Sequence, residues 1–169
     1  MPTVELHPPR EWPTLGRQLV SWMEYHLPHG PGDVQGQPLW ICDEAAQFVL
    51  DCYRLYPHDH KLWAGRRVVE YGLLSEPKGF AKSELAAALV VAEFVGPCRF
   101  DHWAKKGEVS SWGYAYAEGE PVGKPMTYPF IRILATEEGQ TGNTYKVVYA
   151  MLRHAQDKYG NCPAGRFMD

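Results

Sequence analysis

The sequence has 169 residues, of which 45% are hydrophobic and 22% are charged, a composition typical of one soluble globular domain rather than a disordered chain. Its net charge of −3 gives no general attraction to nucleic acid or anionic membranes, so contact with DNA would depend on a local patch. The four cysteines form no Cys-x-x-Cys pair and follow no secretory signal. This pattern argues against a disulfide framework or a zinc site and favours reduced thiols in a cytosolic protein.

The N-terminal part is predicted to be an extended arm followed by helices. Residues 1–16 carry four prolines, which favour an extended arm. Residues 14–27 are predicted to form a helix because their large apolar side chains recur at helical spacing. Residues 29–38 are rich in glycine and proline and predict a loop. The apolar face of the first helix consists of Leu15, Leu19, Trp22, Met23 and Leu27.

A second amphipathic helix is predicted within residues 39–56. Asp43 stands before a run of good helix formers and is the expected N-cap. Residues 57–66 then predict a turn. The expected apolar face of this helix consists of Ala46, Val49, Leu50, Tyr53 and Tyr56.

The rest of the chain predicts two strand–helix units separated by an irregular excursion. The apolar segments 66–75 and 129–136 are read as strands buried on both faces. Helices are expected at 82–94 and 143–156, the second with Tyr145, Val148, Tyr149 and Leu152 on one side. The excursion, residues 96–127, alternates aromatic with polar residues and is compatible with a hairpin. This order of elements predicts an α/β fold with a parallel sheet.

The segment GLLSEPKGFAKSELAAAL, residues 72–89, places Lys82 and Ser83 between a predicted strand and a predicted helix. Strand, loop, Lys-Ser and helix is the layout of a phosphate-binding P-loop. The usual P-loop motif, G-x-x-x-x-G-K-[ST], is not matched, because its two glycine positions hold Glu76 and Ala81. The glycine of this loop is Gly79 instead. The residues alone leave two interpretations open: a nucleotide site, or a strand-to-helix corner with a solvated lysine.

The altered loop retains the chemistry that a phosphate site needs. Backbone N–H groups at a helix N-terminus attract anions, a lysine neutralises the β- and γ-phosphates, and the next hydroxyl ligates Mg²⁺. Alanine is the smallest substitute for glycine, and a second lysine adds positive charge to the loop. The predicted cofactor-binding residues here are Pro77, Lys78, Gly79, Phe80, Ala81, Lys82, Ser83 and Glu84.

Six segments of the chain, taken in order, resemble the N-terminal ATPase part of tailed-bacteriophage terminase large subunits. They are PTLG, HGPGDVQGQPL, EAAQFVLDCYRLYP, LLSEPKGFAKSELAA, GEPVGKP and LATEEGQTGNTY. The resemblance runs from about residue 13 to about residue 153. In that family a basic residue often precedes G-K-[ST] within the loop, and Lys78 matches it. Ala81 departs from the family's glycine, which puts the loop geometry in question.

The resemblance implies a fold and a domain division. The fold would be an incomplete P-loop NTPase of the RecA-like (ASCE) type, with a parallel sheet preceded by an N-terminal helical segment. Residues 1–60 would form the arm and helices, and residues 61–169 would form the first part of the ATPase core.

The resemblance also implies roles for individual residues. Gln47 would recognise adenine, although it also fits an ordinary polar residue on the solvent-exposed face of a helix. Lys82 would hold the β- and γ-phosphates, Ser83 would ligate Mg²⁺, and Lys78 would reach the γ-phosphate. Lys82 and Ser83 are therefore the expected catalytic residues.

The segment ATEEGQ, residues 135–140, resembles the family's segment after the second core strand. Gln140 would approach the neighbouring nucleotide machinery. Thr136, Glu137 and Glu138 fit a helix cap equally well.

Part of the family's machinery is missing from these 169 residues. ATP hydrolysis in this class requires an apolar strand that ends in Asp-Glu, and no Asp-Glu follows residue 89. The single Asp-Glu pair, Asp43-Glu44, starts a helix before the loop. The carboxylate-rich nuclease domain is absent as well, so the Walker B strand and the nuclease are expected outside this chain.

The function implied by the resemblance is ATP binding in the motor that packages viral DNA into a capsid. The expected cofactors are ATP and Mg²⁺, and the expected location is the host cytoplasm, with no membrane contact. In the complete motor the partners would be double-stranded DNA, the terminase small subunit, the capsid portal and further copies in a ring. Two alternatives stay open: a remnant that binds ATP without turnover, and a non-catalytic protein that binds terminase subunits.

Three further patterns are weaker. His58 and His60 have chelating spacing but no third ligand nearby, which favours a solvated turn. The aromatic and basic residues of the excursion are interpreted as packing residues rather than a DNA surface. Candidates for an arginine that acts across a subunit boundary are Arg99, Arg132 and Arg153.

Overall fold

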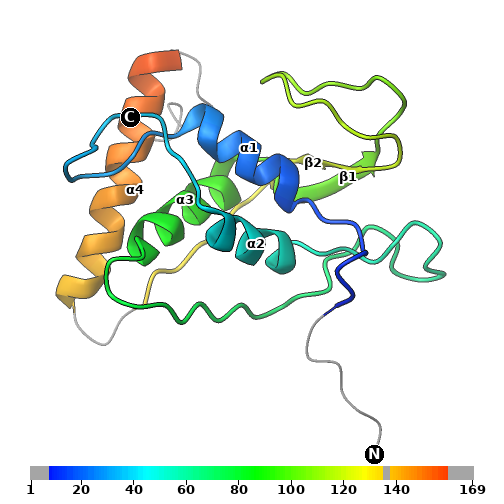
Figure 1. Ribbon diagram of the computed structural model, residues 1–169, viewed down its shortest axis with the longest axis horizontal. Coiled ribbons are helices and arrows are strands. Elements are labelled where there is room, and N and C mark those ends of the chain that lie inside the picture. The colour runs from blue at the N-terminus through cyan, green and yellow to red at the C-terminus, as the bar shows by residue number, and fades with distance from the viewer. Residues whose placement is uncertain (1–7, 135–137, 160–169) are drawn as a thin grey trace, which may run out of the picture.

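The computed structural model describes residues 8–134 and 138–159 (Figure 1). Within this part of the chain, no helix has both the length and the apolar character to cross a membrane. The elements in chain order are α1 (Gly16–His26), α2 (Asp43–Cys52), α3 (Lys82–Val95), β1 (Arg99–Trp103), β2 (Pro121–Lys124) and α4 (Glu138–Tyr159).

Helix α3 is the centre of the hydrophobic core. It packs against α4 and α1, and α1 packs in turn against α2 (Figure 1). Alanines at positions 87, 88 and 92 of α3 are fully buried, and their small size lets the neighbouring helices approach closely. Met23 of α1 and Met151 of α4 are fully buried in the same core.

Helix α1 confirms the predicted apolar face, since all five of its predicted residues are buried. Its start is fixed by Thr14, whose Oγ1 accepts a hydrogen bond from Gly16 N (2.9 Å) and donates one to Leu50 O (2.7 Å). A Cβ atom at position 16 would lie 2.5 Å from the Leu50 Cα atom. Glycine is therefore required where α1 crosses α2.

Helix α2 begins one residue earlier than the sequence indicated, so the predicted N-cap Asp43 is wrong. Cys42 is the N-cap residue and makes no side-chain capping hydrogen bond, while Asp43 is the first helical residue. Asp43 and Glu44 lie in the first turn, where negative charge interacts favourably with the helix dipole.

The excursion does form a hairpin, as expected. Strands β1 and β2 pair antiparallel, with an irregularity in register between Phe100 and His102. The buried Gln18 of α1 joins this hairpin to the core. Its Oε1 accepts hydrogen bonds from Tyr116 Oη (2.9 Å) and Gly123 N (3.1 Å). Its Nε2 donates to Pro121 O (3.3 Å), so the amide is satisfied on both sides.

The predicted parallel RecA-like sheet is wrong. In the described part of the chain, the sheet consists of two antiparallel strands, and both predicted core strands lack strand pairing. Residues 68–76 and 129–134 run as extended chain without arrows in Figure 1. They are also not buried on both faces: Tyr71 is 91% exposed, Leu73 90%, and Phe130 77%.

The error has a physical reason. An apolar, β-branched run favours extended backbone, but a strand forms only where a neighbour accepts and donates its backbone hydrogen bonds. The first segment makes such contacts only at its start, where Leu55 and Arg67 form an isolated antiparallel bridge. Residues 135 and 136, the end of the second predicted strand, lie outside the described residues.

Candidate functional site

The candidate phosphate loop ends in a sharp turn directly before α3. Ala81 is the N-cap residue and has left-handed backbone angles, φ 56° and ψ 29°. Gly79, two residues earlier, has φ 100°. The left-handed region costs a side-chain-bearing residue about 1 kcal/mol, and the sequence places alanine where glycine fits without strain.

Replacing Ala81 with glycine is expected to raise the free energy of unfolding by up to about 1 kcal/mol. The substitution removes the Cβ strain at positive φ, although the greater freedom of glycine in the unfolded chain offsets part of the gain. Urea denaturation measures the change. A matched Ala86→Gly variant in the helical part of α3 should instead lose about 1 kcal/mol. Destabilisation by Ala81→Gly would contradict the left-handed conformation.

Lys82 is the first residue of α3, and the loop wraps around its side chain. The Lys82 Nζ atom donates hydrogen bonds to the carbonyl oxygens of Glu76 (2.5 Å) and Pro77 (2.7 Å). No side chain caps this helix end. The N–H groups of Lys82 and Ser83 have no hydrogen-bond acceptor among the described residues. Two free amides and one ammonium at a helix N-terminus are an arrangement that binds anions.

The remaining predicted loop residues divide into exposed and packed ones. Pro77, Lys78, Gly79 and Ser83 are exposed to solvent. Phe80 is partly buried against the core, where it lines a small cavity between the start of α2 and the start of α3.

Glu84 has a structural contact that the sequence did not indicate. Its Oε1 accepts a hydrogen bond from Gly30 N (2.8 Å) and lies 3.1 Å from the Nδ1 atom of His29. Glu84 therefore connects the loop of residues 29–38 to the first turn of α3. Its negative charge also reduces the positive potential beside Lys82.

The structure does not bring Gln47 to the loop by any hydrogen bond within the described residues. Its Nε2 donates to Asp51 Oδ1 (2.9 Å) one turn later on α2. Thr136 and Glu137 lie outside the described residues. Gln140 falls within α4, but its side chain is also outside the described part.

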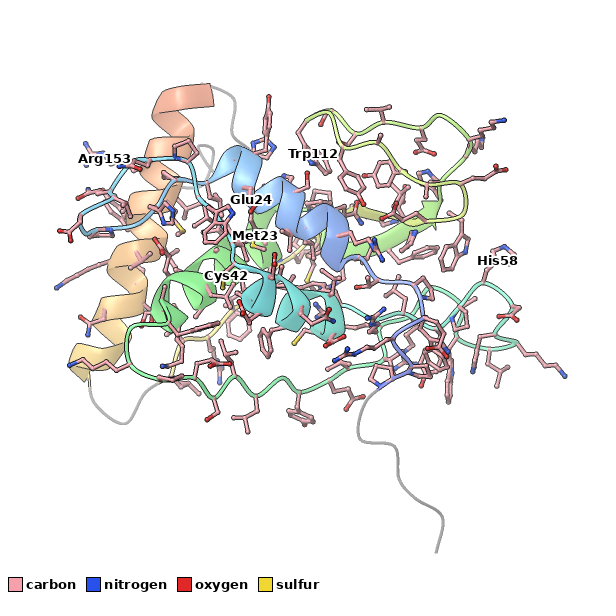
Figure 2. The ribbon with its side chains drawn as sticks, viewed as in Figure 1. Met23, Glu24, Cys42, His58, Trp112 and Arg153 are labelled. Carbon is pink, nitrogen blue, oxygen red and sulfur yellow. The ribbon has the colours of Figure 1, made fainter. Side chains whose placement is uncertain are left out.

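The weaker patterns are explained by packing. The ring of His58 makes an edge contact with Trp103, and His60 stacks on Trp63. In the described ranges no three His, Cys, Asp or Glu residues form a group that could hold a metal ion. Trp112 lies beside α1, as Figure 2 shows, and its Nε1 donates to Ser21 Oγ (3.3 Å).

A charged cluster at the other end of α3 was missed by the sequence reasoning. Glu93 Oε1 accepts hydrogen bonds from Tyr53 Oη (2.6 Å) and an Arg67 guanidinium nitrogen (2.8 Å). Its Oε2 pairs with Arg99 (2.8 Å), and the Arg67 guanidinium lies 3.9 Å from the centre of the Tyr53 ring. The available signal was one glutamate within the otherwise apolar run of residues 85–95.

The contacts of Glu93 change the pKa of its carboxyl group. Burial alone would raise the pKa of Glu93, but the hydrogen bond from Tyr53 and the charge of Arg67 outweigh it and lower that pKa. Arg99 is held by this intramolecular ion pair, which does not favour it as an arginine that acts across a subunit boundary. Arg132 lies over the Phe130 ring, and Arg153 is exposed on α4 (Figure 2).

A second feature is an apolar groove between α3, α4 and residues 129–133. Its volume is about 700 Å³, and its walls offer no charged side chain. The groove therefore has no phosphate chemistry. Its lining includes Val90, Phe94, Phe130, Ile133, Tyr145 and Val148.

Comparison with known proteins gives two phage relatives. The chain is 27% identical over 160 residues to the Gene 13 protein of Mycobacterium phage L5, covering 87% of this chain and 25% of the relative. It is 26% identical over 167 residues to the Gene 13 protein of Mycobacterium phage D29, covering 91% and 26%. The similar proteins are phage proteins. The chain spans about a quarter of the length of these curated relatives.

Neither of the other two comparisons adds a match. No protein-family model matches the chain. No solved structure matches it either.

Proposed function

We propose that this chain is the ATP-binding N-terminal part of a phage terminase large subunit, the motor that packages viral DNA into the capsid. The observation that carries the proposal is the position of Lys82 at the uncapped N-terminus of α3, beside two free amides. The ordered resemblance to terminases supports it, and so does the phage origin of the relatives.

The residues present fit the phosphate part of Mg-ATP. Lys82 would exchange its two carbonyl partners for the β- and γ-phosphates, and the free amides of Lys82 and Ser83 would donate to phosphate oxygens. The exposed Ser83 hydroxyl would ligate Mg²⁺, and the exposed Lys78 would add charge near the γ-phosphate. The bound nucleotide supplies the phosphoanhydride bond whose hydrolysis drives the motor. Packaging would also involve double-stranded DNA, the small subunit, the capsid portal and a homo-oligomeric ring.

The test is a calorimetric titration of the 169-residue chain with Mg-ATP. Wild type is expected to bind saturably, and Lys82→Ala should weaken binding by about 30- to 150-fold, since a charged hydrogen-bonding group contributes about 2–3 kcal/mol. Lys106→Ala, which removes an exposed lysine in the hairpin loop, is the matched control and should bind like wild type. Equal binding by wild type and Lys82→Ala would refute the proposal.

A second candidate is ATP binding without turnover by these residues alone. It is favoured by one observation, the lack of any Asp-Glu after residue 89 to position Mg²⁺ and polarise the attacking water. Phosphate release during the same titration distinguishes the two. Phosphate release that depends on Lys82 would place the water-activating carboxylate within this chain. ATP binding without phosphate release would place that carboxylate outside it.

A further inference from the structure

A cavity of about 460 Å³ lies beside the Glu93 cluster, at the opposite end of α3 from Lys82. Its walls come from residues 64–67, from residues 98–100 at the start of β1, and from the core residues Leu15 and Leu55. Three of the lining residues are arginines, Arg66, Arg67 and Arg99. The aromatic ring of Phe100 forms part of the apolar wall.

The charges around this cavity do not balance. Glu93 is the carboxylate that pairs with Arg67 and Arg99, and no acidic side chain lines the cavity itself. The side chain of Arg66 is exposed and forms no ion pair within the described chain. The three arginines that line the cavity are thus accompanied by one carboxylate, which pairs with two of them, so these side chains carry an excess of two positive charges. The C-terminal end of α3 offsets only about half a charge.

Two of the three arginines, Arg67 and Arg99, are also held in place before any ligand arrives. Arg67 is fixed by Glu93 and by its contact with the Tyr53 ring, and it retains several free N–H groups. Arg99 donates to Glu93 and to the carbonyl oxygen of Cys98. Burial and the nearby Glu93 raise the pKa of the Cys98 thiol to about 11, so it stays neutral and does not compensate the arginines.

We propose that this arginine cavity binds a phosphate group, as a free phosphate ion or as the terminal group of a phosphate monoester. A phosphate carries about −1.5 to −2 charges at neutral pH, which matches the excess of two. Planar guanidinium groups bind its oxygens in pairs, and Phe100 offers an apolar surface to the remainder of an ester.

The site is separate from the candidate ATP loop. Glu93 follows Lys82 by eleven residues on the same helix, a rise of about 16 Å. The proposal does not depend on the proposed function, and the two can fail independently. A Lys82→Ala background removes phosphate binding at the loop and isolates the arginine cavity.

The experiment titrates the Lys82→Ala chain with inorganic phosphate and with phenyl phosphate in chloride buffer, followed by ³¹P NMR. Saturable binding is expected, with about tenfold weaker binding after Arg66→Gln, an exposed position whose replacement should not affect folding. Arg153→Gln, an exposed arginine on α4, is the matched control and should leave binding unchanged. Tighter binding of phenyl phosphate supports a monoester ligand, and tighter binding of inorganic phosphate supports the free ion.

Two results would overturn the proposal. One is the lack of saturable binding of either probe in the Lys82→Ala chain. The other is equal affinity with and without Arg66→Gln while circular dichroism shows both variants folded.

Discussion

Glu93→Gln is expected to lower the free energy of unfolding by about 2–4 kcal/mol. The glutamate side chain is only 21% exposed, and its loss leaves Arg67 and Arg99 without their shared anion in a partly buried place. The Tyr53 hydroxyl loses a charged acceptor at the same time. Urea denaturation measures the change, and Glu70→Gln, at an exposed glutamate without an ion pair in the described chain, should change stability by less than about 0.5 kcal/mol.

The same variant should change the pH dependence of stability. The folded-state pKa of Glu93 is lowered, so its stabilising contribution is present above its unfolded pKa of about 4.3 and is lost as the pH falls through the folded value. Wild type should therefore lose stability below about pH 5 more steeply than Glu93→Gln. If the two proteins lost the same free energy of unfolding between neutral and acid pH, the Glu93 carboxylate would not be stabilised by its arginine and tyrosine partners.

Self-association is the second large effect that the structure predicts. The extended segments 69–75 and 128–134 present unpaired backbone and exposed apolar side chains, with Leu73 90% exposed and Leu134 86% exposed. Unpaired, apolar, extended segments favour pairing between copies. Sedimentation velocity of the purified chain should show species larger than the monomer, in proportions that rise with concentration.

A charged variant tests whether these segments cause the association. The double variant Phe130→Glu, Leu134→Glu should shift the chain toward monomer because it places two like charges on one segment. Leu62→Glu, at an isolated exposed leucine of the turn, should leave the association unchanged. A wild-type chain that stays monomeric at all concentrations would contradict this account.

Local sequence patterns predicted the helices well. The spacing of Leu15, Leu19 and Met23 identified the buried face of α1, and the junction at Lys82 gave the start of α3. These features depend on residues within a few turns of one another, which the sequence displays directly. On α4 the pattern was only partly right, since Val148 is buried but Tyr145 is 60% exposed.

Features that depend on distant partners were not predictable in the same way. The two apolar segments were read as buried strands, but hydrophobicity does not specify a neighbour that completes a ladder. The contacts of Glu93 with Tyr53 and Arg67 join residues 40 and 26 positions apart. The contact between Glu84 and His29 spans 55 positions. For the candidate site, the sequence located the loop and its lysine, but it did not reveal that Glu84 and Gln47 already have partners.

The most direct test of the central claim is amide hydrogen exchange of the 169-residue chain with and without Mg-ATP. Binding at the N-terminus of α3 should slow exchange at residues 78–84, above all at the free amides of Lys82 and Ser83. Lys82→Ala should abolish this protection while leaving the exchange of α1 unchanged. Unchanged exchange at residues 78–84 under saturating Mg-ATP, or protection only elsewhere, would contradict the assignment of this loop as the nucleotide site.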